Sequence, residues 1–361
     1  MEELLLMTLE EQLIIHATQK NIPISGILEL LPLCNMNCDM CYVRLSPEEL
    51  SFQGRIRTAE EWIKLSMKMK EQGVLFLLLT GGEPLLYPEF QKLYTALTNL
   101  GFIITINTNG TLINEDIASF LAQNKPRRVN VTLYGKDSDT YESLCHYRNG
   151  FKQTIQGIKL LKRFNIDVKL NGSLTKANLK DIDSLIDIAN ELNVPIQIDT
   201  YMFPSFRERS RAFQEVIRLT PTEAAFSEIY ISKRLHTPEN FEKYRQQMQT
   251  RGNIPPQNIH DCSSRCRAGK SSFVVNWIGN MTPCIMLTNP SINVFEHGFE
   301  KSWNYIVREV QKITTSSTCA SCKRRNICQT CIASALYETG SYNGTPRYLC
   351  EYCEAFYNNL I

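Results

Sequence analysis

The sequence is organised around the run Leu33-Cys34-Asn35-Met36-Asn37-Cys38-Asp39-Met40-Cys41-Tyr42, which follows an apolar, strand-like segment. Its cysteines are spaced C-x3-C-x2-C, and an aromatic residue follows the last of them. A four-iron cluster that only transfers electrons takes four cysteines, so three cysteines leave one iron open to another ligand. The turn formers Asn35, Asn37 and Asp39 favour a loop around a cluster over a helix. A zinc site here would lack a fourth protein ligand, because no His lies nearby.

The composition is that of an ordinary globular protein. The 361 residues include 43% hydrophobic and 21% charged residues, with a formal net charge of +2. This balance gives no sign of a nucleic-acid-binding stripe or a membrane surface, and the acidic N-terminus is unlike a signal peptide. We therefore expect a cytoplasmic protein, in which 13 cysteines serve cluster or metal ligation and not disulfides.

Between 27 and 200, apolar strand-like segments alternate with amphipathic helices, the pattern of repeated β–α units. The predicted strands, all rich in Ile, Val, Leu or Phe, are Ile27–Leu33, Val74–Thr80, Ile103–Thr108, Arg128–Leu133, Asp167–Leu174 and Pro195–Thr200. Six such units with right-handed crossovers form either a partial barrel or a doubly wound sheet. Both folds place ligands at the carboxyl ends of the strands, where Cys34, Gly81 and Asn109 fall.

Two helices between these strands have clear sequence signals. Thr58-Ala59-Glu60-Glu61 is a capping box that predicts a helix to Glu71, ended by Gly73. Asn178 and Asp181 predict the start of another helix. The apolar residues at helical spacing are Trp62, Leu65 and Met69 in the first helix and Ile182, Leu185, Ile186 and Ala189 in the second.

The rest of the chain differs in character from this alternating part. A polar stretch from 202 to 260 has helical pieces and few strand signals, and we interpret its Arg207, Arg209 and Arg211 as a solvated face. The other interpretation is contact with a substrate or cofactor carboxylate. After Ile259 the sequence becomes rich in cysteine and predicts few long helices.

The run Thr80-Gly81-Gly82-Glu83-Pro84 follows the second predicted strand, one β–α unit after the cysteines. With the cysteine motif it makes the chain resemble the radical S-adenosylmethionine (SAM) superfamily. That resemblance implies a four-iron, four-sulfur cluster on Cys34, Cys38 and Cys41 whose open iron binds SAM. SAM is then cleaved to methionine and a 5′-deoxyadenosyl radical, and the protein supplies orientation and exclusion of water.

The resemblance also implies which residues bind SAM. The Gly81–Pro84 run would hold the SAM amino group, because glycines allow close approach and a carboxylate pairs with an ammonium. Tyr42 matches an aromatic position that lies against adenine. The implied cofactor-binding residues, which would otherwise be ordinary turn and strand-end residues, are Tyr42, Gly81, Gly82, Glu83, Pro84, Asn109, Thr132 and Ser173.

The cysteines of the C-terminal region form a second pattern. Cys266 precedes Gly279 and Cys284, a C-x2-C-x5-C-x2-C run spans Cys319 to Cys331, and Cys350 follows. The pattern is similar to the SPASM extension of radical SAM enzymes, although two residues and not three separate Cys328 from Cys331. A zinc ribbon would need about 15 to 20 residues between its cysteine pairs.

The SPASM resemblance implies two auxiliary four-iron, four-sulfur clusters, and three clusters in all. Their implied ligands are Cys262, Cys266, Cys284 and Cys331 for one, and Cys319, Cys322, Cys328 and Cys350 for the other. Cys353 competes with Cys350. Cys145 is left over, and a lone cysteine is ordinarily a core residue. Its functional interpretation, as the candidate catalytic residue, is hydrogen-atom donation to a substrate radical.

These resemblances predict an α/β fold with a partial (β/α)6 TIM-like barrel and a C-terminal SPASM domain. The expected divisions are an N-terminal extension over 1–26, the radical SAM barrel over 27–201, a bridging region over 202–259 and the SPASM domain over 260–361. Only 33 residues precede Cys34, too few for a winged-helix leader-binding domain. We therefore expect a separate leader-binding protein or recognition by the enzyme's own surface, and an electron donor such as flavodoxin or ferredoxin.

The expected function is maturation of a ribosomally synthesised peptide, with a thioether crosslink favoured over epimerisation or carbon–carbon crosslinking. A small-molecule enzyme of haem or quinone-cofactor biosynthesis is a second class, and an iron–sulfur electron carrier without catalysis a third. Sulfatase maturases that resemble this chain place an aspartate after the Pro-Cys pair, where Ile285 stands here. That difference argues against a formylglycine maturase.

Overall fold

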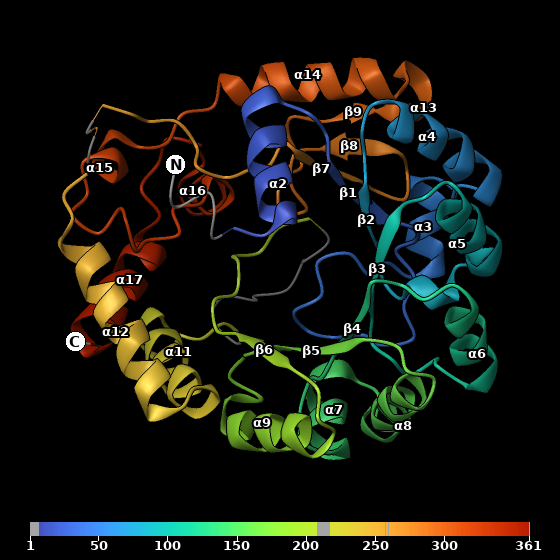
Figure 1. The fold of residues 1–361 in the computed structure, drawn as a ribbon, viewed down its shortest axis with the longest axis horizontal. Coiled ribbons are helices and arrows are strands. Elements are labelled where there is room, and N and C mark those ends of the chain that lie inside the picture. Colours follow the sequence, from blue (N-terminus) through green and yellow to red (C-terminus); the bar gives the residue numbers. More distant parts are fainter. Residues whose placement is uncertain (1–6, 208–216, 257, 259, 361) are drawn as a thin grey trace.

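The structure of the chain, a computed structural model, describes residues 7–207, 217–256, 258 and 260–360. One sheet has the strand order β6-β5-β4-β3-β2-β1-β7-β8-β9. The strands are β1 (Ser25–Glu29), β2 (Phe76–Thr80), β3 (Ile103–Thr108), β4 (Arg128–Thr132), β5 (Val168–Ser173), β6 (Ile196–Asp199), β7 (Ser272–Val275), β8 (Asn280–Thr282) and β9 (Ile292–Asn293). β1 to β6 are parallel and follow one another in chain order. This sequential order excludes a doubly wound sheet, in which the strand order reverses, and gives a curved partial barrel (Figure 1).

The predicted strands are recovered with one shift. β3 has the predicted bounds, and β2, β4, β5 and β6 lie within the predicted segments. β1 begins and ends earlier than the predicted Ile27–Leu33. Beyond its end the chain still contacts the next unit, because Leu30 N donates to Thr80 O and Gly82 N donates to Leu31 O. The segment leading to the cysteines is therefore extended although it lies outside the ladder.

Helices cover the outer face of the sheet (Figure 1). Those of the barrel are α3 (Pro47–Gln53), α4 (Ala59–Glu71), α5 (Phe90–Asn99), α6 (Glu115–Gln123), α7 (Ser138–Cys145), α8 (Gly150–Arg163) and α9 (Ile182–Glu191), with single turns η1 (Pro84–Leu86) and η2 (Leu179–Asp181). The predicted capping box at Thr58 is present, since Thr58 Oγ1 accepts from Glu61 N and the Glu61 carboxylate accepts from Thr58 N. Both predicted apolar faces are buried in the core.

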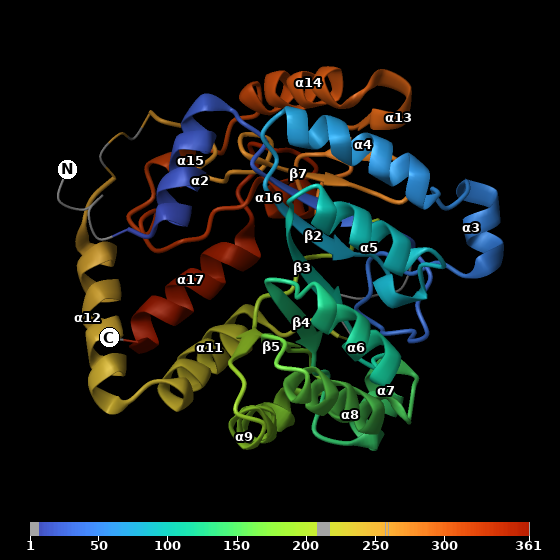
Figure 2. The same cartoon turned by 45° about the vertical axis from the view of Figure 1, so that its right-hand side comes forward.

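The remaining helices belong to the N-terminal and C-terminal parts of the chain. They are α2 (Leu9–Lys20), α11 (Pro221–Leu235), α12 (Pro238–Asn253), α13 (Val294–His297), α14 (Phe299–Gln311), α15 (Ser317–Ala320), α16 (Ile332–Thr339) and α17 (Arg347–Leu360). α11 packs against α17, and both lie with α12 at the side of the molecule beyond β6 (Figures 1 and 2). Among the described residues after 259, two helices exceed ten residues, α14 with 13 and α17 with 14, in keeping with the prediction of few long helices.

The cysteine-rich region is joined directly to the barrel sheet. β7 pairs in parallel with β1, with Gly26 opposite Phe273, and the hairpin β7–β8 and strand β9 continue the sheet. Gly26 leaves room for this pairing, since a Cβ there would lie 2.5 Å from the Phe273 ring. The barrel and the C-terminal region therefore share one sheet.

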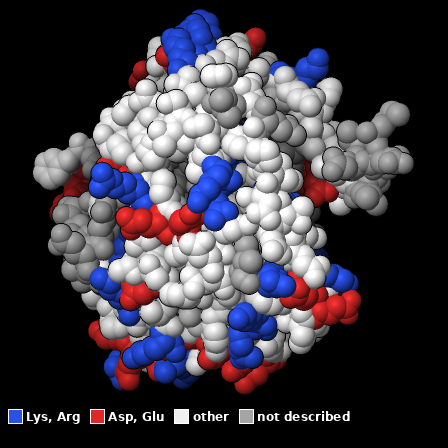
Figure 3. All heavy atoms as spheres, turned by 90° about the vertical axis from the view of Figure 1, so that its left-hand side faces the viewer, with Lys and Arg blue, Asp and Glu red and all other residues white. Residues whose placement is uncertain are grey.

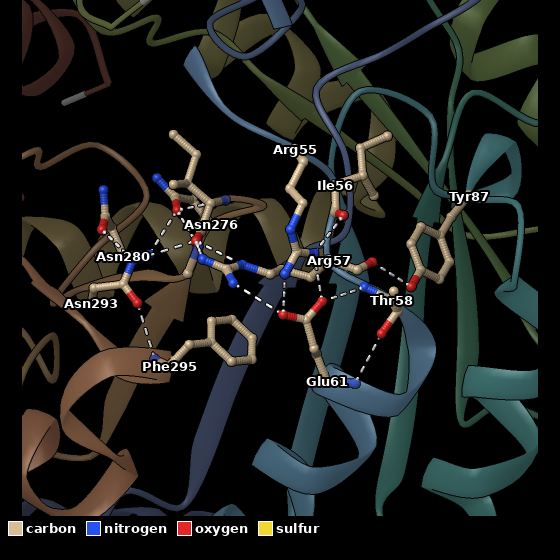
Figure 4. A network of polar contacts seen from close by, with 12 residues as sticks. Arg55, Ile56, Arg57, Thr58, Glu61, Tyr87, Asn276, Asn280, Asn293 and Phe295 are labelled. Carbon is tan, nitrogen blue, oxygen red and sulfur yellow. Dashed lines mark hydrogen bonds and ion pairs between the residues drawn. The ribbon is translucent and has the colours of Figure 1, made fainter. Parts of the chain in front are cut away.

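Hydrogen bonds from Arg57, which lies just before α4, fix the turn of this hairpin to the barrel (Figure 4). We call this contact between Arg57 and Ile278 the latch. Arg57 donates from Nε and Nη2 to Ile278 O at 3.0 and 2.7 Å, and its guanidinium lies 4.4 Å from the centre of the Phe295 ring. Asn276 Oδ1 accepts three backbone N–H groups of the turn, from Ile278, Gly279 and Asn280. The turn is thus held by both its own side chains and the barrel.

The inner, concave face of the barrel is polar over β3 to β6, whereas Ile27, Phe76 and Leu78 make it apolar over β1 and β2. Along each strand the residues that alternate with the apolar core face this side, and on β3 to β6 they include Asn107, Asn130, Asn171 and Gln197. We call these four residues the amide row; it consists of two neighbouring pairs, with Asn107 opposite Asn130 and Asn171 opposite Gln197, and Lys169 lies opposite Asn130 on β5. Asn130 Nδ2 donates to Asn107 Oδ1 at 2.8 Å. A closed TIM barrel fills this space with branched apolar side chains, so the polar lining here suits a bound polar molecule.

Charged groups of both signs are mixed on the surface shown in Figure 3, in keeping with the small net charge. Within the described ranges, no helix has the length and apolar character needed to cross a membrane.

Candidate active site

Cys34, Cys38 and Cys41 lie in a loop, as predicted, and not on a helix. Two of their sulfur atoms accept backbone N–H groups of the same loop, from Met36 to Cys34 Sγ at 3.4 Å and from Arg44 to Cys41 Sγ at 3.3 Å. Burial raises the pKa of the Cys34 thiol to about 12, and the nearby Cys38 and Cys41 thiols add to this rise. Such a thiol stays protonated unless a metal displaces the proton, and N–H groups directed at sulfur suit a cluster ligand.

The end of α7 is docked onto this loop. Asn37 N donates to Cys145 O at 2.9 Å, and Asp39 N donates to Leu144 O at 3.0 Å. Cys145 is fully buried in a cluster with Met36, Met40, Tyr141, Leu144 and Met202. Its thiol hydrogen bonds with that of Cys38 and, together with burial, raises the pKa of Cys38 well above its usual range. The structure therefore places Cys145 against the cysteine loop, within the core.

The two glycines of the Gly81–Pro84 run allow close packing against the cysteine loop's own backbone. Gly82 N donates to Leu31 O at 2.8 Å, and Glu83 N donates to Leu33 O at 2.9 Å. A Cβ at Gly81 would lie 2.4 Å from Leu31 O, and one at Gly82 would lie 2.2 Å from Leu33 O. Any larger residue would push the run away from the segment that enters the cysteine loop.

The Glu83 carboxylate is fully buried. It accepts hydrogen bonds from Thr108 Oγ1 at 2.7 Å, Asn109 N at 2.8 Å and Leu85 N at 3.1 Å. Burial raises its pKa to about 7, against the effect of these donors. Among the described residues, the groups that lower this pKa are hydrogen-bond donors and none is a cation. A buried carboxylate without a cationic partner fits the ammonium group of a ligand.

The other predicted SAM-binding residues are placed as follows. Asn109 Nδ2 donates to Asn35 Oδ1 at 2.9 Å and to Cys34 Sγ at 3.7 Å, so it connects the end of β3 to the cysteine loop. Tyr42 stacks on Phe206 with ring centres 5.2 Å apart. Thr132 and Ser173 end β4 and β5 at the same edge of the sheet, and no described contact joins them to Glu83 or Asn109.

Sequence reasoning missed a buried ion pair at this edge. Glu29, at the end of β1, is 1% exposed and accepts two hydrogen bonds from Arg207, at 2.8 and 2.9 Å. The interpretation of Arg207 as part of a solvated face is therefore wrong, while Arg209 and Arg211 lie outside the described residues. An acidic residue within the apolar run from Ile27 to Leu31 was the available signal, since such a charge is buried only with a partner.

The C-terminal cysteines form two groups in space. Cys284 interacts with Cys331 and Cys266, and burial raises its pKa to about 11. Cys350 interacts with Cys319, Cys328 and Cys322, and burial raises its pKa to about 11 as well. These groups follow the interleaved pattern implied by the SPASM resemblance.

Two cysteines at the edges of these groups differ from that pattern. The backbone carbonyl of Cys262 accepts from Thr315 N at 2.7 Å, but no described contact joins its thiol to Cys266, Cys284 or Cys331. Cys353 hydrogen bonds with Cys328 and lowers the pKa of that thiol to about 7. Cys350 and Cys353 both come from α17, and both lie beside the second group.

A cavity of about 1040 Å³ connects these groups with the barrel. Gln197 and Asp199 of β6 line it on one side, and Glu228, Arg325 and residues of α17 line it elsewhere. The cysteines in its wall are Cys266, Cys284, Cys319, Cys328, Cys331 and Cys353. Within the described residues, no three His, Cys, Asp or Glu side chains are arranged to hold a single metal ion. In a cluster, by contrast, the thiolates bind different irons.

Sequence comparisons place the chain among known enzymes. Residues 28–189 match the model of the radical SAM superfamily. Over 328 residues the chain is 24% identical to an AdoMet-dependent heme synthase of Methanosarcina barkeri, covering 87% of this chain and 92% of that protein. Over 169 residues it is 28% identical to the sporulation killing factor maturation protein SkfB of Bacillus subtilis, covering 46% of this chain and 39% of that protein.

Solved structures extend the likeness to the C-terminal region. Streptococcus suis SuiB bound to precursor peptide SuiA matches with a TM-score of 0.69 at 20% identity, covering 94% of this chain and 80% of that one. Native anSMEcpe with bound AdoMet matches with a TM-score of 0.68 at 18% identity, covering 93% and 96%. The predicted fold, a partial barrel followed by a cysteine-rich SPASM domain, is confirmed. Residues 28–189 therefore form a radical SAM domain, and over most of its length the chain is similar in sequence to an AdoMet-dependent heme synthase and in fold to a structure with bound AdoMet.

Proposed function

We propose that this enzyme cleaves SAM reductively at a cluster held by Cys34, Cys38 and Cys41 and uses the radical to modify a ribosomally synthesised peptide. A thioether crosslink is the favoured product, ahead of epimerisation or a carbon–carbon crosslink. When bound, the cluster and SAM supply the radical chemistry. The chain's own residues bind, orient and exclude water, and Glu83 is proposed to offset the charge of the SAM ammonium.

The observation that carries the peptide substrate is the amide row on the concave face. Side-chain amides donate and accept hydrogen bonds as peptide groups do, so neighbouring amides suit an extended peptide. The amides share their face with two cations, Arg128 and Lys169. Arg128 pairs with Asp167. Lys169 Nζ donates to Gln197 Oε1, and Gln197 Nε2 donates to Asp199 Oδ1. A tetrapyrrole with several carboxylates would instead favour a cluster of cations.

The auxiliary clusters are part of the proposal. Their proposed ligands are Cys262, Cys266, Cys284 and Cys331 for the first, and Cys319, Cys322, Cys328 and Cys350 for the second. Five of these cysteines line one cavity, which supports the assignment, and Cys353 competes with Cys350; the five are Cys266, Cys284, Cys319, Cys328 and Cys331. Because the cavity reaches β6, an electron from an oxidised substrate would have a short path to these clusters.

Haem biosynthesis is the second candidate. It is favoured by the likeness to the AdoMet-dependent heme synthase, which extends over 87% of this chain, whereas the likeness to SkfB extends over 46%. The amide row argues for the peptide, since its side chains are uncharged. Formylglycine formation is disfavoured because Ile285 follows Cys284 where a carboxylate is expected.

Other parts of the proposal concern partners and location. An electron donor such as flavodoxin or ferredoxin, a separate leader-binding protein and a cytoplasmic location stay predictions. Cys145 stays the candidate hydrogen-atom donor, although its full burial beside Cys38 favours a packing role. Changing Cys145 to Ala separates the two: a donor variant still cleaves SAM but loses product, whereas a packing variant keeps its product per SAM cleaved.

Mass spectrometry of a peptide encoded beside this gene and co-expressed with the enzyme tests the function, because each bond type gives its own mass change. We expect a modified peptide, and Asn171→Ala should lower the yield of product without lowering SAM cleavage. Asn190→Ala, on the exposed side of α9, is the matched control and should behave as wild type. Conversion of a tetrapyrrole precursor, with all candidate peptides unmodified, would instead establish the haem alternative.

A further inference from the structure

Arg325 is a buried cation within the second group of C-terminal cysteines. It lies in the turn between Cys322 and Cys328, where its N–H donates to Cys322 O at 3.0 Å. The residue is only 6% exposed. The turn thus brings a guanidinium into the interior beside residues proposed as cluster ligands.

The protein offers this guanidinium little compensation. Its Nη2 lies 3.7 Å from Asp261 Oδ2, beyond hydrogen-bond distance, and the Asp261 side chain is 43% exposed. Its Nη1 is buried and has no hydrogen-bond partner among the described residues. A buried charge is costly unless an opposite charge offsets it, and a half-exposed carboxylate is screened by water.

A cluster bound in the adjacent cavity would supply the negative charge that Arg325 lacks. The wall of that cavity contains Arg325 and cysteines of both groups, and among these cysteines Cys328 ends the turn that carries Arg325. A four-iron cluster held by four thiolates has a net negative charge, and net charge is one of the properties that set its reduction potential. A nearby cation stabilises the reduced form of a cluster, which carries one more electron. The position of Arg325 would therefore affect how readily the cluster accepts an electron.

We propose that Arg325 is the counter-charge of the auxiliary cluster held by Cys319, Cys322, Cys328 and Cys350 and that it raises the reduction potential of this cluster. The inference rests on the proposed auxiliary cluster. In this role Arg325 is a positioning residue, because it acts on the cluster through its charge. The raised potential makes the cluster a better acceptor of one electron.

The neighbouring arginine provides a matched control. Arg324 Nε donates to Glu354 Oε2 at 2.8 Å, and its guanidinium lies 3.5 Å from the centre of the Tyr357 ring. Arg324 is absent from the cavity wall. Arg324→Gln and Arg325→Gln therefore each remove one positive charge from the same turn. The Arg324 charge is paired with Glu354 away from the cavity, whereas the Arg325 charge lies beside the cavity.

The test is an EPR-monitored redox titration of the full-length, reconstituted chain with Cys34, Cys38 and Cys41 all changed to Ala, so that only auxiliary clusters report. We expect Arg325→Gln to lower the one-electron reduction equilibrium constant about tenfold, which is about 59 mV. Arg325→Lys, which keeps the charge, should restore most of the potential, and Arg324→Gln should leave it unchanged.

Iron analysis separates failure of this inference from failure of the auxiliary cluster. Cys328→Ala should lose about four irons, and no loss would refute the cluster and the role of Arg325 with it. An unchanged potential in Arg325→Gln at full iron content would refute the role of Arg325 alone, as would an equal shift in Arg324→Gln. Loss of iron in Arg325→Gln but not in Arg325→Lys would support the counter-charge, whereas loss in both would contradict it.

Discussion

Thr108 Oγ1 donates a hydrogen bond of 2.7 Å to the buried carboxylate of Glu83, and so joins the end of β3 to the glycine run that follows β2. The next residue, Asn109, adds its N–H to the same carboxylate and its side-chain amide to the cysteine loop. One buried acid therefore organises three segments that end at the same edge of the sheet. Its protonation has consequences for stability.

We predict that Glu83 makes the iron-free protein less stable as pH rises from about 4.5 to about 7. The pKa is raised from 4.5 to about 7 on folding, so the folded state holds the proton more tightly and loses this advantage as pH rises. The full effect is about 3 kcal/mol from the size of the shift. Urea unfolding of wild type and Glu83→Gln at pH 5 and pH 7.5 measures it. The variant should lose this pH dependence, and an unchanged slope would show that Glu83 is not its source.

The glycine of the SPASM pattern has a structural role that can be tested by comparison. Gly279 has a φ of +103°, and a Cβ there would lie 2.3 Å from the Phe295 ring. We expect Gly279→Ala to cost about 3 kcal/mol, from backbone strain and overpacking together. Gly298 also has a positive φ, but nothing lies within 4 Å of its Cβ position, so Gly298→Ala should cost about 1 kcal/mol. Equal costs in thermal unfolding would contradict the packing argument.

The contact between the barrel and the β7–β8 hairpin depends on Arg57 rather than on the nearby Arg55. Arg57 bonds twice to the Ile278 carbonyl, whereas the Arg55 side chain is 62% exposed and pairs with Glu61. Arg57→Ala should lower the free energy of unfolding by about 2 kcal/mol, since hydrogen bonds from a charged donor are lost. Arg55→Ala should lower the free energy of unfolding by less than Arg57→Ala does, because the exposed ion pair of Arg55 is screened by water. Chemical denaturation of both variants checks this, and a larger loss in Arg55→Ala would show that the contact does not depend on Arg57.

The sequence patterns were most successful for features that depend on residues close together in the chain. The Thr58 capping box, the apolar face of α9 and five of the six barrel strands follow from spacing within a few residues. The pairing of β1 with β7 was not predictable, because it joins segments about 250 residues apart and neither carries a signal for the other. Glu29 in its apolar run indicated a buried ion pair, but the sequence did not show that the partner is Arg207, 178 residues away.

In the candidate site, too, local features were predicted and contacts between distant segments were not. The turn formers Asn35, Asn37 and Asp39 predicted a loop around the three cysteines of the first motif, and the structure has one. The sequence did not predict that Cys145 would lie against Cys38, or that the glycines would pack on Leu31 and Leu33, since these contacts arise from packing between separate β–α units. The helix carrying Cys350 and Cys353 was also missed, because its buried face forms against α11 and α12, which are distant in sequence.

The central claim is that Cys34, Cys38 and Cys41 hold the cluster at which SAM is cleaved. The most direct measurement is the release of 5′-deoxyadenosine from SAM by the reconstituted, reduced enzyme, with iron analysis of the same samples. We predict release by wild type, and none from Cys38→Ala, which should lose about four irons and keep the rest. Release by Cys38→Ala at the wild-type rate, or wild-type protein that is fully loaded with iron and releases none, would contradict the account.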